Sequence, residues 1–76
     1  MPRLRRLSGR EVRGILEHHG FLLVRQKGSH MIMQRRKPEG GATTVPVPDH
    51  RELKTGTLLG IIEQSGLLRA LFETQE

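Results

Sequence analysis

The sequence contains no cysteine, no tryptophan and no tyrosine, and only two phenylalanines among its 76 residues. The lack of cysteine excludes disulfides, thiolate metal sites and cysteine nucleophiles, and it suits a protein of the reducing cytoplasm. The scarcity of aromatic side chains removes the platforms on which many proteins stack single-stranded bases. No apolar run reaches about 18 residues, so the sequence predicts no membrane span. The N-terminal arginines precede no apolar stretch, so we expect no secretory signal.

The short length predicts one small domain with a thin core. A chain of this size buries only about 60% of the surface that it exposes when unfolded. Apolar residues make up 34% of the sequence, which is enough for a folded chain but leaves little excess. We therefore expect a single domain over residues 1–76, with a basic N-terminal arm at residues 1–6 and a polar tail at residues 73–76.

Positive charge is concentrated in the first half of the chain. The net charge is +5, from thirteen Lys and Arg against eight Asp and Glu. Residues 1–37 hold ten of the basic and two of the acidic side chains, whereas residues 38–76 hold three and six. A basic half favours a partner that carries phosphates or acidic groups. Charge alone leaves open that this surface only keeps the protein soluble.

The first periodic segment predicts a helix at about residues 9–19. Ser8 and Glu11 are spaced as in a capping box, in which each side chain accepts a hydrogen bond from the other residue's amide. Gly20 suits the left-handed position that ends a helix. Between these signals, one helical stripe contains Val12, Ile15, Leu16 and His19.

A β-hairpin is predicted next. Residues 21–26 and 30–36 have the composition of strands, and residues 27–29 supply a tight turn with a glycine. Because side chains alternate along a strand, the second strand has two distinct faces. One face contains His30, Ile32 and Gln34, and the other contains Met31, Met33 and Arg35. We expect the two methionines to fill the core.

The second half predicts an edge strand and another helix. Residues 43–48 form a strand that must lie at a sheet edge or be bulged, because its two prolines cannot donate to a ladder. We expect Thr55 or Thr57 to cap the second helix and Gly66 to end it. A final helical turn is expected within residues 67–72. The buried stripe of the second helix contains Leu58, Ile61 and Ile62.

The order helix–strand–strand–strand–helix, with short connections, defines the expected fold class. It predicts an α+β domain in which a three-stranded antiparallel sheet carries both helices on one face. The opposite face of the sheet is then open to a ligand.

Histidines are the only side chains in this sequence suited to acid–base chemistry near neutral pH. Of the four histidines, His18 and His19 lie where a helix dipole favours a cationic imidazole. His30 follows the hairpin turn and is a candidate for catalysis or binding, with an ordinary exposed histidine as the alternative. For His50, after the edge strand, a turn-stabilising role and a functional role are both open. The basic side chains near His30 in the sequence are Arg25, Lys27, Arg35, Arg36 and Lys37.

Motifs for other chemistries are absent from the sequence. No histidine spacing such as H-x3-H or H-E-x-x-H indicates a metal site. No P-loop, dinucleotide fingerprint or Ser/His/Asp arrangement is present. The amides of Gly28 and Ser29 can contribute to an anion-binding nest. Without aromatic platforms, contact with nucleic acid is expected to depend on phosphates and A-form shape.

Several short motifs follow one another from about residue 7 to residue 67. They are Ser8-Gly9-x-Glu11, Gly20-Phe21, Arg25-Gln26-Lys27-Gly28-Ser29-His30, Val47-Pro48-x-His50 and Leu53-Lys54-x-Gly56-Thr57-Leu58. Each is weak by itself, but in this order and spacing the sequence resembles the HicA family, the small mRNA-interferase toxins of type II toxin–antitoxin pairs.

This resemblance implies a fold like the double-stranded-RNA-binding domain. It also implies a cytoplasmic endoribonuclease that cleaves mRNA without a metal or other cofactor and is held inactive by a HicB-type antitoxin. The family's catalytic histidine falls on His30. Many members carry a second histidine directly after it, where this sequence has Met31.

Such a site needs few groups, because RNA supplies its own nucleophile in the 2′-hydroxyl. His30 is expected to act as general acid or general base, and His50 is the candidate for a second proton carrier. The groups expected to stabilise the phosphate are Lys27, Gly28 and Ser29. Those expected to position the RNA backbone are Arg25, Arg35, Arg36 and Lys37.

Two other functions remain open from the sequence. One is a non-catalytic RNA-binding module with the same fold and the same basic surface. The other is a protein-interaction domain whose basic half binds an acidic partner.

Overall fold

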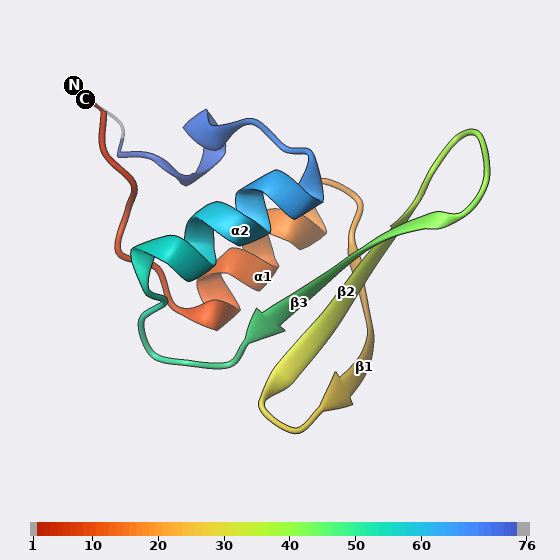
Figure 1. Cartoon of the computed structure of the whole chain (residues 1–76), viewed down its shortest axis with the longest axis horizontal. Coiled ribbons are helices and arrows are strands. Elements are labelled where there is room, and N and C mark those ends of the chain that lie inside the picture. Colours follow the sequence, from red (N-terminus) through yellow and green to blue (C-terminus); the bar gives the residue numbers. More distant parts are fainter. Residues whose placement is uncertain (1, 75–76) are drawn as a thin grey trace.

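The computed structural model describes residues 2–74. Three strands form one antiparallel sheet in the order β1-β2-β3, and two helices cover one of its faces (Figure 1). This arrangement confirms the predicted α+β class and is consistent with a fold like the double-stranded-RNA-binding domain. The elements are α1 (Gly9–His18), β1 (Leu22–Lys27), β2 (His30–Arg36), β3 (Ala42–Pro48), α2 (Thr55–Ser65) and a short 3-10 helix, η1 (Arg69–Phe72).

Helix α1 begins with the predicted capping box. The Ser8 hydroxyl accepts a hydrogen bond from the Glu11 amide at 3.0 Å, and the Glu11 carboxylate accepts one from the Ser8 amide at 2.8 Å. These bonds satisfy amides that have no partner within the helix. At the other end, Gly20 has a φ of 91°, which only glycine adopts easily. Both predicted ends of this helix are therefore confirmed to within one residue.

The hairpin between β1 and β2 turns through two residues, Gly28 and Ser29. Lys27 pairs with His30 across the turn, and Gly28 has a φ of 59° at the first turn position, as in a type II′ turn. The register of β1 shifts between Leu23 and Arg25, which marks a bulge.

Strand β3 lies at an edge of the sheet, as its prolines required. In the β2–β3 register, Pro46 is opposite Ile32 and Pro48 is opposite His30. Both prolines occupy alternate positions of β3, so their missing N–H groups fall on the same side of that strand. The register therefore places two prolines directly beside the open-face residues of β2.

Burial is deepest on the face of the sheet that the helices cover, although Ile32 on the opposite face is also buried, at 6% exposed. Met31 and Met33 are 2% and 0% exposed and pack with the buried valines of β3, which confirms the predicted core role of both methionines. His30 and the other even-numbered residues of β2 share the opposite face with Pro46 and Pro48. The largest core side chains that the helices and flanking segments contribute are Leu7, Leu16, Phe21, Leu58 and Phe72.

Helix α2 begins without the predicted side-chain cap. Lys54 is the N-cap residue and makes no side-chain capping bond, because its ammonium group cannot accept a hydrogen bond. Thr55 and Thr57 lie inside the first turn, past the capping position. The expectation that one of these threonines caps the helix is therefore wrong. Gly66 ends the helix in the left-handed conformation, with a φ of 72°, as predicted. The predicted buried stripe of Leu58, Ile61 and Ile62 is confirmed.

The two terminal segments lie side by side (Figure 1). The Arg5 amide donates to the Phe72 carbonyl at 2.9 Å, and the Thr74 amide donates to the Arg3 carbonyl at 2.7 Å. Within the predicted basic arm at residues 1–6, residues 3–5 are thus hydrogen-bonded to the C-terminal segment at residues 72–74. Met1 and residues 75–76 of the predicted polar tail lie outside the described residues. No helix within residues 2–74 has the length and apolar character needed to cross a membrane.

Gly9 lies where α1 approaches the end of β3, and its replacement tests that contact. A Cβ atom at Gly9 would overlap the carbonyl oxygen of Pro48, so Gly9→Ala is expected to destabilise the fold by about 1–3 kcal/mol. Gly14 of the same helix is the control, because a Cβ there meets no atom within 4 Å. Gly14→Ala is expected to stabilise by up to about 1 kcal/mol. Chemical denaturation measures both, and equal stability of the two variants would contradict the close approach.

Candidate functional site

His30 is the first residue of β2, and its exposed side chain lies on the open face of the sheet. Backbone contacts hold the turn that precedes it. The Asp49 amide donates to the Ser29 carbonyl at 2.7 Å, which ties the turn to the segment after β3. His30 is therefore an exposed histidine on a well-anchored turn, and it borders two adjoining hollows.

The first hollow, called here the basic hollow, measures about 470 Å³ and lies over the open face. It is lined by Arg25, Lys27, His30, Ile32, Thr44 and Pro46. The sheet register explains this grouping, because Arg25 is opposite Ile32 and Lys27 is opposite His30. Two cations and an imidazole thus surround one concave surface, an arrangement suited to binding a phosphate group.

The second hollow, called here the edge groove, measures about 360 Å³ and lies between the β3 edge and α2. It is lined by His30, Pro46 and Pro48 from the sheet and by Gly56, Gly60 and Gln64 from α2. Sequence reasoning missed the α2 residues. The available signal was a pair of glycines one turn apart inside a helix, where glycine lowers stability.

Two further predicted residues, Arg36 and Lys37, lie far from His30 along β2. Arg36 is six positions beyond His30, which corresponds to about 20 Å in an extended strand. Arg36 shares the open face with His30 by strand alternation, and Lys37 begins the loop toward β3. These two cations can therefore contact only a distant part of a long ligand.

Arg35 lies on the core face and is used structurally. Its guanidinium donates to the carbonyl oxygens of His19 at 3.0 Å and Ser65 at 3.5 Å. The same group stacks over the Phe21 ring at 4.7 Å. Arg35 thus links the C-terminal ends of both helices to the sheet, and the expected contact with a ligand on the open face is not available to it. Cations are favoured at helix C-termini.

The structure does not bring the His50 side chain into either hollow that contains His30. Its carbonyl oxygen accepts the Gly9 amide at 2.8 Å, so the backbone of His50 supports the start of α1. Its neighbour Asp49 accepts a hydrogen bond from Arg10 at 3.2 Å, which raises the pKa of that guanidinium. The contacts at this position are those of a structural turn.

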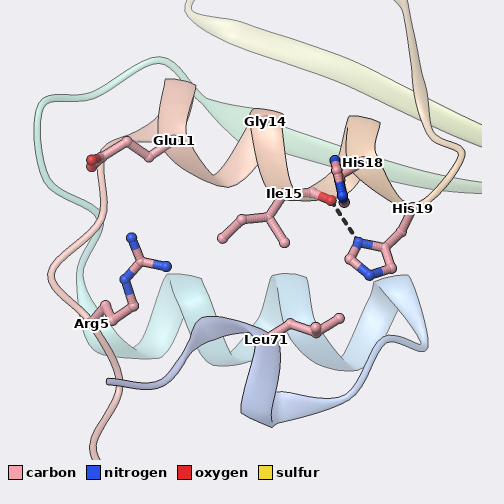
Figure 2. A pocket seen from close by; sticks show the side chains of 7 residues that line it. All are labelled: Arg5, Glu11, Gly14, Ile15, His18, His19 and Leu71. Carbon is pink, nitrogen blue, oxygen red and sulfur yellow. Dashed lines mark hydrogen bonds between the residues drawn. The ribbon is translucent and has the colours of Figure 1, made fainter. Parts of the chain in front are cut away.

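His18 and His19 lie at the C-terminal end of α1 (Figure 2), and neither lines a hollow that contains His30. The Nδ1 atom of His19 donates to the Ile15 carbonyl oxygen at 2.9 Å. Both rings line a hollow of about 380 Å³ that also contains Arg5 and Leu71. Among residues 2–74, no group of three or more His, Cys, Asp or Glu side chains is placed to hold a metal ion.

The element order and the basic open face together define a small α+β protein with a fold like the double-stranded-RNA-binding domain. Comparison with protein families gives a finer assignment. The family model described as the HicA toxin of bacterial toxin–antitoxin systems matches residues 9–67. The chain therefore belongs to the HicA toxin family. A comparison with curated proteins finds no match.

A pair of neighbouring arginines tests the structural role given to Arg35. Arg35→Met removes the bonds to the His19 and Ser65 carbonyls and the contact with Phe21. It is expected to lower the free energy of unfolding by about 1–3 kcal/mol. Arg36→Met makes the same chemical change at an exposed position and is expected to alter stability by less than about 0.5 kcal/mol. Thermal or chemical denaturation that shows no difference between the variants would contradict this role.

Proposed function

We propose that this toxin is an endoribonuclease that cleaves mRNA in the cytoplasm, with His30 as its catalytic residue and without a metal ion or other cofactor. One observation carries the proposal. The exposed imidazole of His30 shares a hollow on the open face with Arg25 and Lys27. Membership of the HicA toxin family supports the same function, because mRNA cleavage is its general activity.

The chemistry requires proton transfer and charge stabilisation at one phosphate. The RNA 2′-hydroxyl attacks the adjacent phosphorus, the bond to the 5′-oxygen breaks, and the products end in a 2′,3′-cyclic phosphate and a 5′-hydroxyl. His30 either takes the proton from the 2′-hydroxyl or gives one to the 5′-oxygen, roles that suit a histidine near neutral pH. Lys27 and Arg25 stabilise the negative charge that develops on the phosphate oxygens.

The remaining predicted residues have different parts in this proposal. The amides of Gly28 and Ser29, next to His30 in the turn, contribute to binding the phosphate. Arg36 and Lys37 hold the RNA backbone farther along the strand, where they add salt-dependent affinity. Arg35 has no contact with RNA, because its guanidinium is engaged by the helix ends.

A HicB-type antitoxin is the expected inhibitor. Family membership implies such a partner in general. Because His30 and the cations around it are exposed, a partner with acidic side chains can neutralise the toxin by covering the open face. Inhibition would then need no change in the fold of the toxin.

The alternative is a non-catalytic RNA-binding module. It is favoured by the separation of His50 from the hollows of His30, which leaves one histidine at the site. Under this alternative the protein binds RNA but releases no cleavage products.

His30→Ala is expected to reduce RNA cleavage by at least about 100-fold, because general acid–base catalysis contributes about 10²–10⁴ in rate. His50→Ala is the matched control and is expected to keep nearly full activity, since its side chain lines neither hollow. Cleavage of a labelled RNA by the purified proteins measures both. Undiminished cleavage by His30→Ala would refute the assignment, and an equal loss in His50→Ala would restore His50 as the second proton carrier.

Cleavage is also expected to persist after exhaustive dialysis against EDTA, because the nucleophile is the 2′-hydroxyl of the RNA and not a metal-bound water. The measurement compares cleavage before and after chelation and after each divalent ion is added back. Substitution of the 2′-hydroxyl by hydrogen at the cleaved nucleotide is expected to abolish the reaction. Activity that is lost with EDTA and restored by one ion would show that the metal-free mechanism is wrong.

A further inference from the structure

The edge groove borders His30 on the side away from the hairpin cations. One wall is the β3 edge with Pro46 and Pro48, and the other wall is α2 with Gly56 and Gly60. The volume of about 360 Å³ lies at the small end of the range for ligand pockets, which is about 300–1,000 Å³. It can hold one nucleotide, but it is too small for the width of an A-form duplex.

The two glycines of α2 keep this groove open at a cost in helix stability. Gly60 lies in the helix interior, where glycine lowers stability by about 1 kcal/mol relative to alanine. Neither has a positive φ, and a Cβ atom at either position would meet no other atom within 4 Å. Backbone conformation and packing therefore do not require glycine at Gly56 or Gly60. Side chains there would instead extend into the groove.

The groove adjoins the basic hollow, because His30 and Pro46 line both. The two spaces differ in chemistry. Arg25 and Lys27 line the basic hollow, whereas the groove has apolar surfaces from Pro48 and Ile61 and neutral polar groups on α2. A nucleic-acid strand has this same division, with charged phosphates on one side and uncharged ribose and base on the other.

We propose that the edge groove holds the ribose and base next to the scissile phosphate of a single-stranded RNA, and that Gln64 and Thr57 determine which bases are accepted. This inference rests on the proposed ribonuclease function. Gln64 and Thr57 are exposed and line the groove across from His30. Their amide and hydroxyl groups can both donate and accept hydrogen bonds, which lets them distinguish base edges. Pro46 and Pro48 provide the apolar surface beneath the base that aromatic residues provide elsewhere.

The test compares two glycine replacements of the same kind. Gly60→Leu fills the edge groove, whereas Gly14→Leu places the same side chain on α1, in a hollow lined by other residues. In both positions a Cβ atom has free space, so both variants are expected to fold, as circular dichroism will show. On a single-stranded RNA of mixed sequence, Gly60→Leu is expected to raise KM and to lower kcat/KM by about tenfold or more. Gly14→Leu is expected to cleave like the wild type.

A second variant tests base selection without filling the groove. Gln64→Ala is expected to change the distribution of cleavage sites, because the lost amide can no longer distinguish base edges. Sequencing of the cleaved ends measures that distribution. An unchanged distribution would contradict base selection by Gln64.

Failure of this inference is distinguishable from failure of the proposed function. If His30→Ala abolishes cleavage but Gly60→Leu cleaves like the wild type, the role of the groove is contradicted and the proposed function stands. Equal cleavage of single-stranded and fully paired RNA would also overturn it. If Gly60→Leu loses affinity for the antitoxin but cleaves normally, the groove is a protein interface and the inference is wrong. Absence of RNA cleavage in the wild type would overturn both proposals.

Discussion

The central strand β2 pairs on both sides, and the alternation of its side chains constrains the rest of the molecule. Met31 and Met33 are buried beneath the helices together with Val45 and Val47 of β3. Successive side chains of a strand point to opposite faces, so the packing that buries the methionines also places His30 on the open face. A shift of register by one residue would exchange the two sets. The burial of the core and the exposure of His30 therefore depend on the same alternation.

The segment after β3 extends this constraint to the turn beside His30. The His50 carbonyl oxygen accepts a hydrogen bond from the Gly9 amide, and the Asp49 amide donates one to the Ser29 carbonyl oxygen. A small core can position a site in this way because backbone hydrogen bonds, together with buried apolar area, hold the turn. Under the proposed mechanism the RNA supplies the nucleophile. The protein then needs only a histidine held in position for proton transfer, cations near the phosphate and a groove that fits the substrate. The small fold is sufficient for that purpose.

Features controlled by neighbouring residues were predictable from the sequence. The capping box of Ser8 and Glu11, the edge position of β3 and the left-handed Gly66 all follow from local geometry. The role of Arg35 was not predictable from charge, because its partners His19 and Ser65 lie 16 and 30 residues away in the chain. Strand alternation had already grouped Arg35 with the buried methionines, and that pattern was a better guide than its position in a basic run.

The sequence by itself determined the elements, their inward and outward faces, the fold class and the family, because periodicity and motif spacing are local properties. Only the tertiary structure decided which charged groups share a hollow with His30. It joined the half-buried guanidinium of Arg35 to the carbonyl oxygens at the ends of both helices. It also brought α2 against the β3 edge and so created the edge groove. Distances between elements depend on how their buried faces pack, and no local pattern contains that information.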